Sequence, residues 1–114
     1  MAWKVRESDP ERSLAVVEVA GVVDSTNVEE FFGFINGVFK KGMKNVVLDM
    51  AFASYLSSGG LSVIADAYKK AQAMGGKLVI ARASEMVRDL FRVAQFEKII
   101  DFYEELEEAV EAVR

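Results

Sequence analysis

The chain has 114 residues, a net charge of -4 and 52% hydrophobic residues, and this length and composition predict one compact globular domain over residues 1–114. It contains no cysteine and no histidine, which excludes disulfides, zinc sites built from those ligands, and Cys-His or Ser-His-Asp catalysis. It also lacks the clustered excess of Lys and Arg that a nucleic-acid binder needs, so we expect no nucleic-acid partner.

The sequence carries no signal for a membrane or for export. No stretch reaches the roughly 18 uninterrupted apolar residues that a membrane-spanning helix needs. The N-terminal segment MAWKVRESDP lacks the apolar middle of a signal peptide. We therefore expect a cytoplasmic protein without a membrane span.

The first third of the chain predicts a hairpin and then a helix. Residues 2–7 alternate between apolar and charged, which indicates a half-exposed strand, and a turn at 8–11 joins it to a more buried strand over 14–20. Asn27, with Glu30 three positions later, predicts a capping box at the start of a helix that ends near Gly42. The inner face of this helix is expected to carry Val28, Phe31, Phe32, Ile35 and Phe39.

The rest of the chain alternates strands with helices. We expect strands over 46–48, 77–81 and 98–102. Ser58 or its neighbour should cap a second helix that ends at Gly75-Gly76, and Ser84 should cap a third. Residues 103–114 should form the last helix. This order predicts a single-domain α/β fold: a mixed, mostly parallel sheet of four to five strands with an antiparallel N-terminal edge, packed with about four helices.

Polar residues gather where the carboxyl ends of the parallel strands meet. Asp24 follows the second strand, Asp49 ends the third, and Ser57-Ser58-Gly59-Gly60 opens the second helix. Reactive surfaces of parallel sheets lie at this edge, where helix N-termini present free N–H groups. Spacing alone more often indicates local roles: a serine cap, glycines that allow a tight turn, and aspartates in local hydrogen bonds.

One resemblance concerns Asp49. The segment NVVLDM is similar to the phosphoacceptor strand of response-regulator receiver domains, in which Asp49 would be the acceptor and Mg²⁺ the cofactor. Receiver domains also resemble one another in a paired acidic site after the first strand and a Lys after the fifth. Here Glu7-Ser8-Asp9 follows the first strand and no Lys-Pro occurs, so we set this interpretation aside.

A second resemblance covers nearly the whole chain. The stretch from Asp49 to Leu61 is similar to the anti-sigma-factor antagonists of the STAS domain family, in which a strand and a hydrophobic loop precede Asp-Ser-Ser/Thr-Gly-Leu at a helix start. The matching places are occupied, without a gap, by Asp49, Tyr55, Leu56, Ser58, Gly60 and Leu61. Gly21-Val22-Val23-Asp24 resembles the family's Gly-x-hydrophobic-Asp turn, and the later elements follow the family's order to an acidic terminal helix.

The resemblance implies a phosphorylation switch. In that family the unphosphorylated protein binds an anti-sigma factor that is also a serine kinase, and this frees the sigma factor for transcription. Phosphorylation by the kinase ends the binding, and a phosphoserine phosphatase resets it. Ser58 aligns with the acceptor, and the adjacent Ser57 is the alternative, because Ser57 and Gly59 stand where the family usually has Asp and Ser/Thr.

The implied partner surface lies around this serine. It comprises Asp24, Ser25, Thr26, Ser57, Ser58, Gly59, Gly60 and Leu61. An enzyme would need Asp24, Asp49 and a lysine such as Lys69 to converge, and no spacing indicates this, so we predict no catalytic activity, metal or cofactor. The expected oligomeric state is a monomer or weak dimer.

One alternative function stays open. A STAS domain can be an adaptor that never meets a kinase, for instance a subunit of a lipid-transport or signalling assembly. In that case Ser58 would be only a helix cap.

Overall fold

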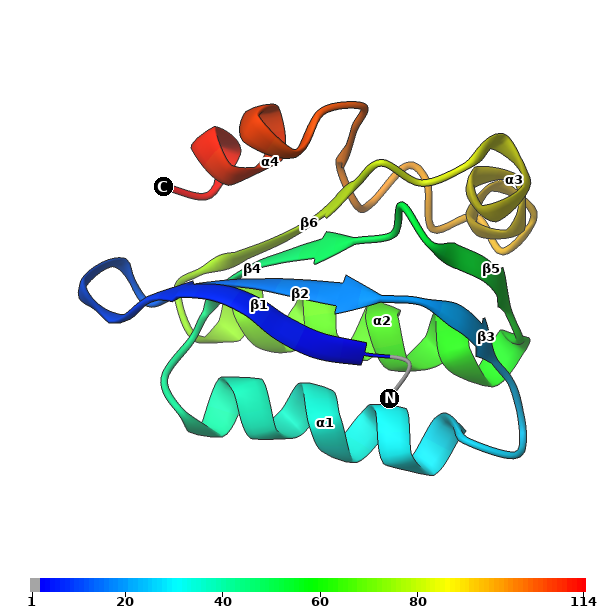
Figure 1. Cartoon of the computed structure of the whole chain (residues 1–114), viewed down its shortest axis with the longest axis horizontal. Helices are drawn as coiled ribbons and strands as arrows, with labels where there is room; N and C mark the ends of the chain where they lie inside the picture. The colour runs from blue at the N-terminus through cyan, green and yellow to red at the C-terminus, as the bar shows by residue number, and fades with distance from the viewer. Residues whose placement is uncertain (1–2) are drawn as a thin grey trace.

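The computed structural model describes residues 3–114, which form a five-stranded sheet with helices on both faces (Figure 1). In spatial order the strands are β1 (Trp3–Asp9), β2 (Leu14–Val19), β4 (Asn45–Asp49), β6 (Lys77–Ala81) and β7 (Phe102–Tyr103). β1 pairs with β2 in antiparallel orientation, and every other neighbouring pair is parallel. The predicted mixed, mostly parallel sheet is confirmed.

Four helices pack around the sheet. α1 (Val28–Lys40) and α2 (Ser58–Ala73) lie side by side on one face, and α4 (Leu106–Ala112) covers part of the other. α3 (Glu85–Val93) lies beyond the end of the sheet (Figure 1). The larger core cluster lies beneath α1 and α2, and a smaller one lies beneath α4.

The element boundaries differ from the expected ones at both ends of the chain. β1 runs to Asp9, and a short 3-10 helix (Pro10–Arg12) takes the place of the expected turn at 8–11; Ala2 lies outside the described residues. The expected strand over 98–102 is only β7, because the amides of Ile99 and Ile100 both donate to the Phe96 carbonyl in a turn. α4 begins later than predicted, at a capping box formed by Glu105 and Glu108.

The inner face of α1 is narrower than its apolar residues suggest. Phe31, Ile35 and Phe39 are buried, and the Phe31 ring packs on Trp3 with 5.1 Å between centroids. Phe32 was expected on this face but is 49% exposed. Neighbouring helical residues point about 100° apart, so Phe32 cannot share the direction of Phe31.

A second, two-stranded sheet was not predicted. β3 (Gly21–Val23) pairs in parallel with β5 (Ala53–Leu56). Gly21 has a φ of +77°, a conformation that suits glycine and that separates β3 from β2. The small sheet extends the carboxyl end of the main sheet and holds the segments after Val23 and Leu56 together.

Asp49 is the only fully buried polar or charged residue among residues 3–114. Its carboxylate accepts hydrogen bonds from Arg6 Nη1 at 2.7 Å, and from Arg82 Nε at 3.1 Å and Nη2 at 2.5 Å. The Ala51 amide donates a further bond at 3.2 Å. The bond to Asp49 raises the pKa of Arg82, which therefore stays charged.

This burial agrees with setting aside the receiver-domain interpretation of Asp49. The carboxylate is enclosed between two arginines, so it is neither an exposed phosphoacceptor nor part of a partner surface. Because Arg6 comes from β1 and Arg82 follows β6, the carboxylate instead joins strands on either side of β4.

We expect Asp49→Asn to lower the free energy of unfolding by about 2 kcal/mol, because the amide presents donors to two guanidinium groups and loses its charge. Asp101→Asn is the control, since Asp101 forms an exposed ion pair with Lys77 at 3.2 Å and should cost less than about 0.5 kcal/mol. Urea denaturation followed by circular dichroism measures both. Equal losses in the two variants would contradict the buried network.

Candidate functional site

Two loops meet at the end of the small sheet. Val23 and Leu56 are register partners, and the Ser57 amide donates to the Val23 carbonyl at 2.8 Å. A Cβ placed on Gly59 would lie 3.5 Å from Val28 Cγ2, so the first turns of α1 and α2 touch. We call the residues gathered here the switch surface: Asp24, Ser25, Thr26, Ser57, Ser58 and Gly59.

Ser57, rather than Ser58, caps α2. Ser57 has an extended backbone, and its Oγ accepts a hydrogen bond from the Gly60 amide at 3.2 Å. Ser58 is the first residue of the helix and is exposed, and its hydroxyl bonds to no other residue within 3–114. The two adjacent hydroxyls therefore have separate roles, one structural and one available to another molecule.

The loop before α1 holds an ionised aspartate. Asp24 Oδ1 accepts hydrogen bonds from the Thr26 hydroxyl at 2.5 Å and from the Thr26 amide at 2.9 Å. These bonds lower the pKa of Asp24 below its ordinary value. The switch surface therefore carries a fixed negative charge at neutral pH.

The predicted capping box at Asn27 is wrong. Asn27 stands at the N-cap position, but its side chain makes no capping bond to α1. Instead its Oδ1 accepts from the Asp24 amide and its Nδ2 donates to the Val22 carbonyl, both at 2.9 Å. Asn27 thus closes the loop that presents Asp24, Ser25 and Thr26.

The two glycines of the motif differ in environment. Gly60 is buried, and a Cβ there would lie 3.0 Å from Val23 Cγ1, so Gly60 lets α2 pack closely on β3. Leu61 is also buried, with 6% of its surface exposed. Gly59 is exposed, and a Cβ added there would make only ordinary van der Waals contacts. Of Gly59, Gly60 and Leu61, which were all expected on the partner surface, only Gly59 is exposed in this conformation.

Exposed apolar side chains lie on the small sheet and in the turn before β5. Val22 is 42% exposed, its register partner Tyr55 is 44% exposed, and Phe52 is 65% exposed. The sequence did not predict this group, because β3 and β5 are too short to show a period. The signal in the sequence was the pair of aromatic residues, Phe52 and Tyr55, in the segment between a strand and a helix.

Two further kinds of site are absent from the described part of the chain. Residues 3–114 contain no cluster of three or more acidic side chains close enough to hold a metal ion. Within the same residues, no helix has both the length and the apolar character needed to cross a membrane.

We expect Ser57→Ala to lower the free energy of unfolding by about 1 kcal/mol, because the variant loses the bond between the cap and the Gly60 amide. Ser58→Ala should change stability by less than about 0.5 kcal/mol, since the Ser58 hydroxyl is exposed. Urea denaturation of the two variants and the wild type provides the measurement. The reverse order would place the cap at Ser58.

Comparisons with known proteins agree with this architecture. The family model described as STAS domain matches residues 4–109. Over 94 residues the chain is 32% identical to a Bordetella bronchiseptica protein provisionally named anti-sigma factor antagonist BtrV, covering 82% of this chain and 81% of that protein.

Solved structures show the same fold at lower identity. An anti-sigma factor antagonist from Mycobacterium paratuberculosis has a TM-score of 0.85 at 23% identity, covering 98% of this chain and 92% of that one. Unphosphorylated SpoIIAA has a TM-score of 0.82 at 19% identity, covering 97% and 95%. The phosphorylated Bacillus SpoIIAA has a TM-score of 0.74 at 19% identity, covering 99% and 100%.

The family match spans most of the chain, and the curated relative supports the resemblance found in the sequence. The chain therefore belongs to the STAS domain family, and within it resembles the anti-sigma factor antagonists.

Proposed function

We propose that the protein is an anti-sigma factor antagonist controlled by phosphorylation of Ser58. The unphosphorylated protein binds an anti-sigma factor serine kinase and thereby releases a sigma factor. The kinase phosphorylates Ser58 and dissociates, and a phosphoserine phosphatase restores the binding form. The name of the Bordetella relative and the matching sequence motif support this assignment.

The observation that carries the proposal is the division of roles between the two serines. A kinase needs a hydroxyl that it can reach and that the fold does not use. Ser58 meets this condition because it is exposed at the start of α2, whereas Ser57 Oγ already binds the Gly60 amide. Ser58 is therefore the acceptor that we propose in place of Ser57.

The chemistry of the step follows from this position. The Ser58 oxygen forms a bond to the γ-phosphorus of the kinase's ATP, the bond from that phosphorus to the bridging oxygen breaks, ADP leaves, and the hydroxyl proton passes to a base or to water. The product sits at a helix N-terminus, where the dipole and free amides favour a phosphate. The fold should therefore survive the modification.

The same phosphate would oppose partner binding. It adds about -1.5 to -2 charges to a surface on which Asp24 is already ionised. An interface that covered Ser58 would have to remove this charge from water beside a like charge. A penalty of about 3 kcal/mol would lower affinity more than a hundredfold.

Burial of exposed apolar side chains would favour binding by the unphosphorylated form. Val22 and Tyr55 lie one register position from Val23 and Leu56, next to the switch surface, and Phe52 lies in the turn before β5. Burying apolar and aromatic side chains supplies most of the favourable free energy in protein interfaces. Attraction from these side chains and repulsion from the phosphate would then act on the same interface.

The adaptor alternative explains Ser58 as a helix cap. The cap is Ser57, which removes that explanation. Ser57 and Gly59, which stand where the family usually has Asp and Ser/Thr, still favour an adaptor, and absence of phosphorylation by every kinase would support it.

Incubation with ATP and each anti-sigma factor serine kinase of the source cell should add one phosphate that peptide mapping assigns to Ser58. Ser58→Ala should remain unmodified, and Ser57→Ala should still accept phosphate because its acceptor is intact. Intact-mass spectrometry measures the stoichiometry. Absence of phosphate with every kinase, or phosphate on Ser57, would refute the assignment.

Ser58→Asp should weaken kinase binding by at least roughly tenfold, because it places a negative charge at the same helix start. Ser8→Asp adds the same charge to an exposed serine beside the β1–β2 turn, at the end of the molecule opposite β3 and β5 (Figure 1), and should bind like the wild type. Titration calorimetry compares the three proteins. Equal affinities for Ser58→Asp and the wild type would exclude a charge-based switch.

A further inference from the structure

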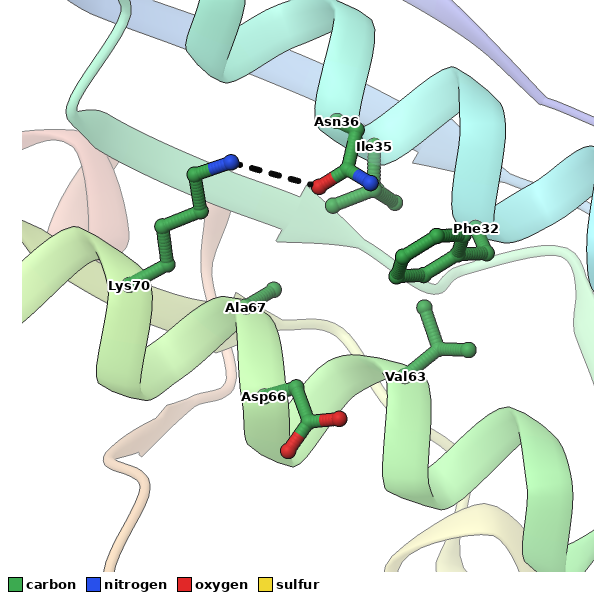
Figure 2. Close-up of a pocket in the computed structure, with 7 residues that line it drawn as sticks. All are labelled: Phe32, Ile35, Asn36, Val63, Asp66, Ala67 and Lys70. Carbon is green, nitrogen blue, oxygen red and sulfur yellow. Dashed lines mark hydrogen bonds between the residues drawn. The ribbon is translucent and has the colours of Figure 1, made fainter.

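An unfilled groove of about 280 Å³ lies between α1 and α2 (Figure 2). Phe32 of α1 and Val63 of α2 face each other across it. Farther along, Lys70 Nζ donates to Asn36 Oδ1 at 3.4 Å and bridges the two helices. Asp66 lies on the α2 rim. The groove therefore has an apolar end, a polar end and one acidic side chain at its edge.

The apolar end is continuous with the switch surface. Phe32 follows Val28 by four residues and Val63 follows Gly59 by four, so each pair lies on one face of its helix. Val28 and Gly59 are the residues through which the first turns of α1 and α2 touch. The groove thus begins one helical turn beyond the residues next to Ser58.

We propose that the anti-sigma factor kinase extends its contact from the switch surface into this groove and seats one apolar side chain between Phe32 and Val63. The inference rests on the proposed function, and it identifies Phe32 as a residue that selects the partner. A basic side chain of the partner lies beside Asp66, which is exposed and has no ion pair within residues 3–114.

The size and exposure of the groove fit this occupant. Its volume is about 280 Å³, just below the roughly 300–1,000 Å³ of pockets that enclose small molecules. Phe32 is 49% exposed although Phe31 beside it is buried, so about half of the Phe32 side chain remains for a partner to cover. Exposed aromatic side chains that become buried near the centre of an interface contribute strongly to affinity.

The test compares the affinity of Phe32→Ala and wild type for each ADP-bound anti-sigma factor serine kinase of the source cell, by titration calorimetry. We expect Phe32→Ala to raise Kd by roughly tenfold to a hundredfold. Asp66→Asn should raise Kd by roughly threefold and weaken its dependence on salt. Thermal unfolding checks that both variants are folded.

Ile99→Ala is the matched control. Ile99 is 51% exposed, similar to Phe32 at 49%, but lines a different cavity, with Tyr68 and Phe96. Its affinity should equal that of the wild type. A loss as large as that of Phe32→Ala would show a general effect of surface apolar area and overturn the proposal.

The remaining outcomes distinguish failure of the groove proposal from failure of the proposed function. Equal binding by Phe32→Ala and the wild type would overturn the groove and leave the proposed function standing. Failure of every kinase to bind the wild type would overturn both. Sedimentation could also show that the wild type is a dimer and that Phe32→Ala is a monomer. That result would assign the groove to a second copy of this chain and overturn the kinase as its occupant.

Discussion

The parallel pairing of β3 with β5 brings together the two loops of the proposed partner surface. The two strands are short, yet the bond from the Ser57 amide to the Val23 carbonyl at 2.8 Å places the α2 N-terminus beside the loop that carries Asp24. Without this pairing, the residues of the switch surface would belong to two unrelated loops. The close packing of Gly60 on Val23 keeps the same two segments together from the core side.

The proposed switch combines a free hydroxyl with neighbours that respond to charge. Ser57 supplies the cap with a neutral side chain. The carboxylate of the switch surface is that of Asp24, which its bonds to Thr26 keep ionised. Apolar exposure on the small sheet favours association, and a second negative group at Ser58 would oppose it. Local capping chemistry and partner control therefore share one helix start without competing for the same atom.

The sequence was sufficient for β1, β2, β4 and β6 of the main sheet, because alternating or buried strands and amphipathic helices leave a clear pattern. It was insufficient where a tertiary contact decides the outcome. β3 and β5 are too short to show a period, and Phe32 satisfies the helical pattern of α1 yet lies half exposed at its edge. Asn27 has the residue type of a cap, but its side chain serves the preceding loop instead.

The sequence motif located the candidate site. It did not assign the roles of the individual residues within that site. Spacing could not decide between two adjacent serines, since either could cap α2. Nor could it show that Asp49 is enclosed, because the two arginines that bind it are 43 and 33 residues away along the chain.

Those sequence separations also set the order in which the three side chains emerge from the ribosome. Arg6 and Asp49 leave the ribosome before Arg82 emerges, so a nascent chain at first has only one of the two cations that enclose the carboxylate. A buried charge without its full set of partners is costly, and Asp49 should stay hydrated until β6 and Arg82 have emerged. The centre of the sheet would then close late in translation, after both helices of the first layer are already available to pack.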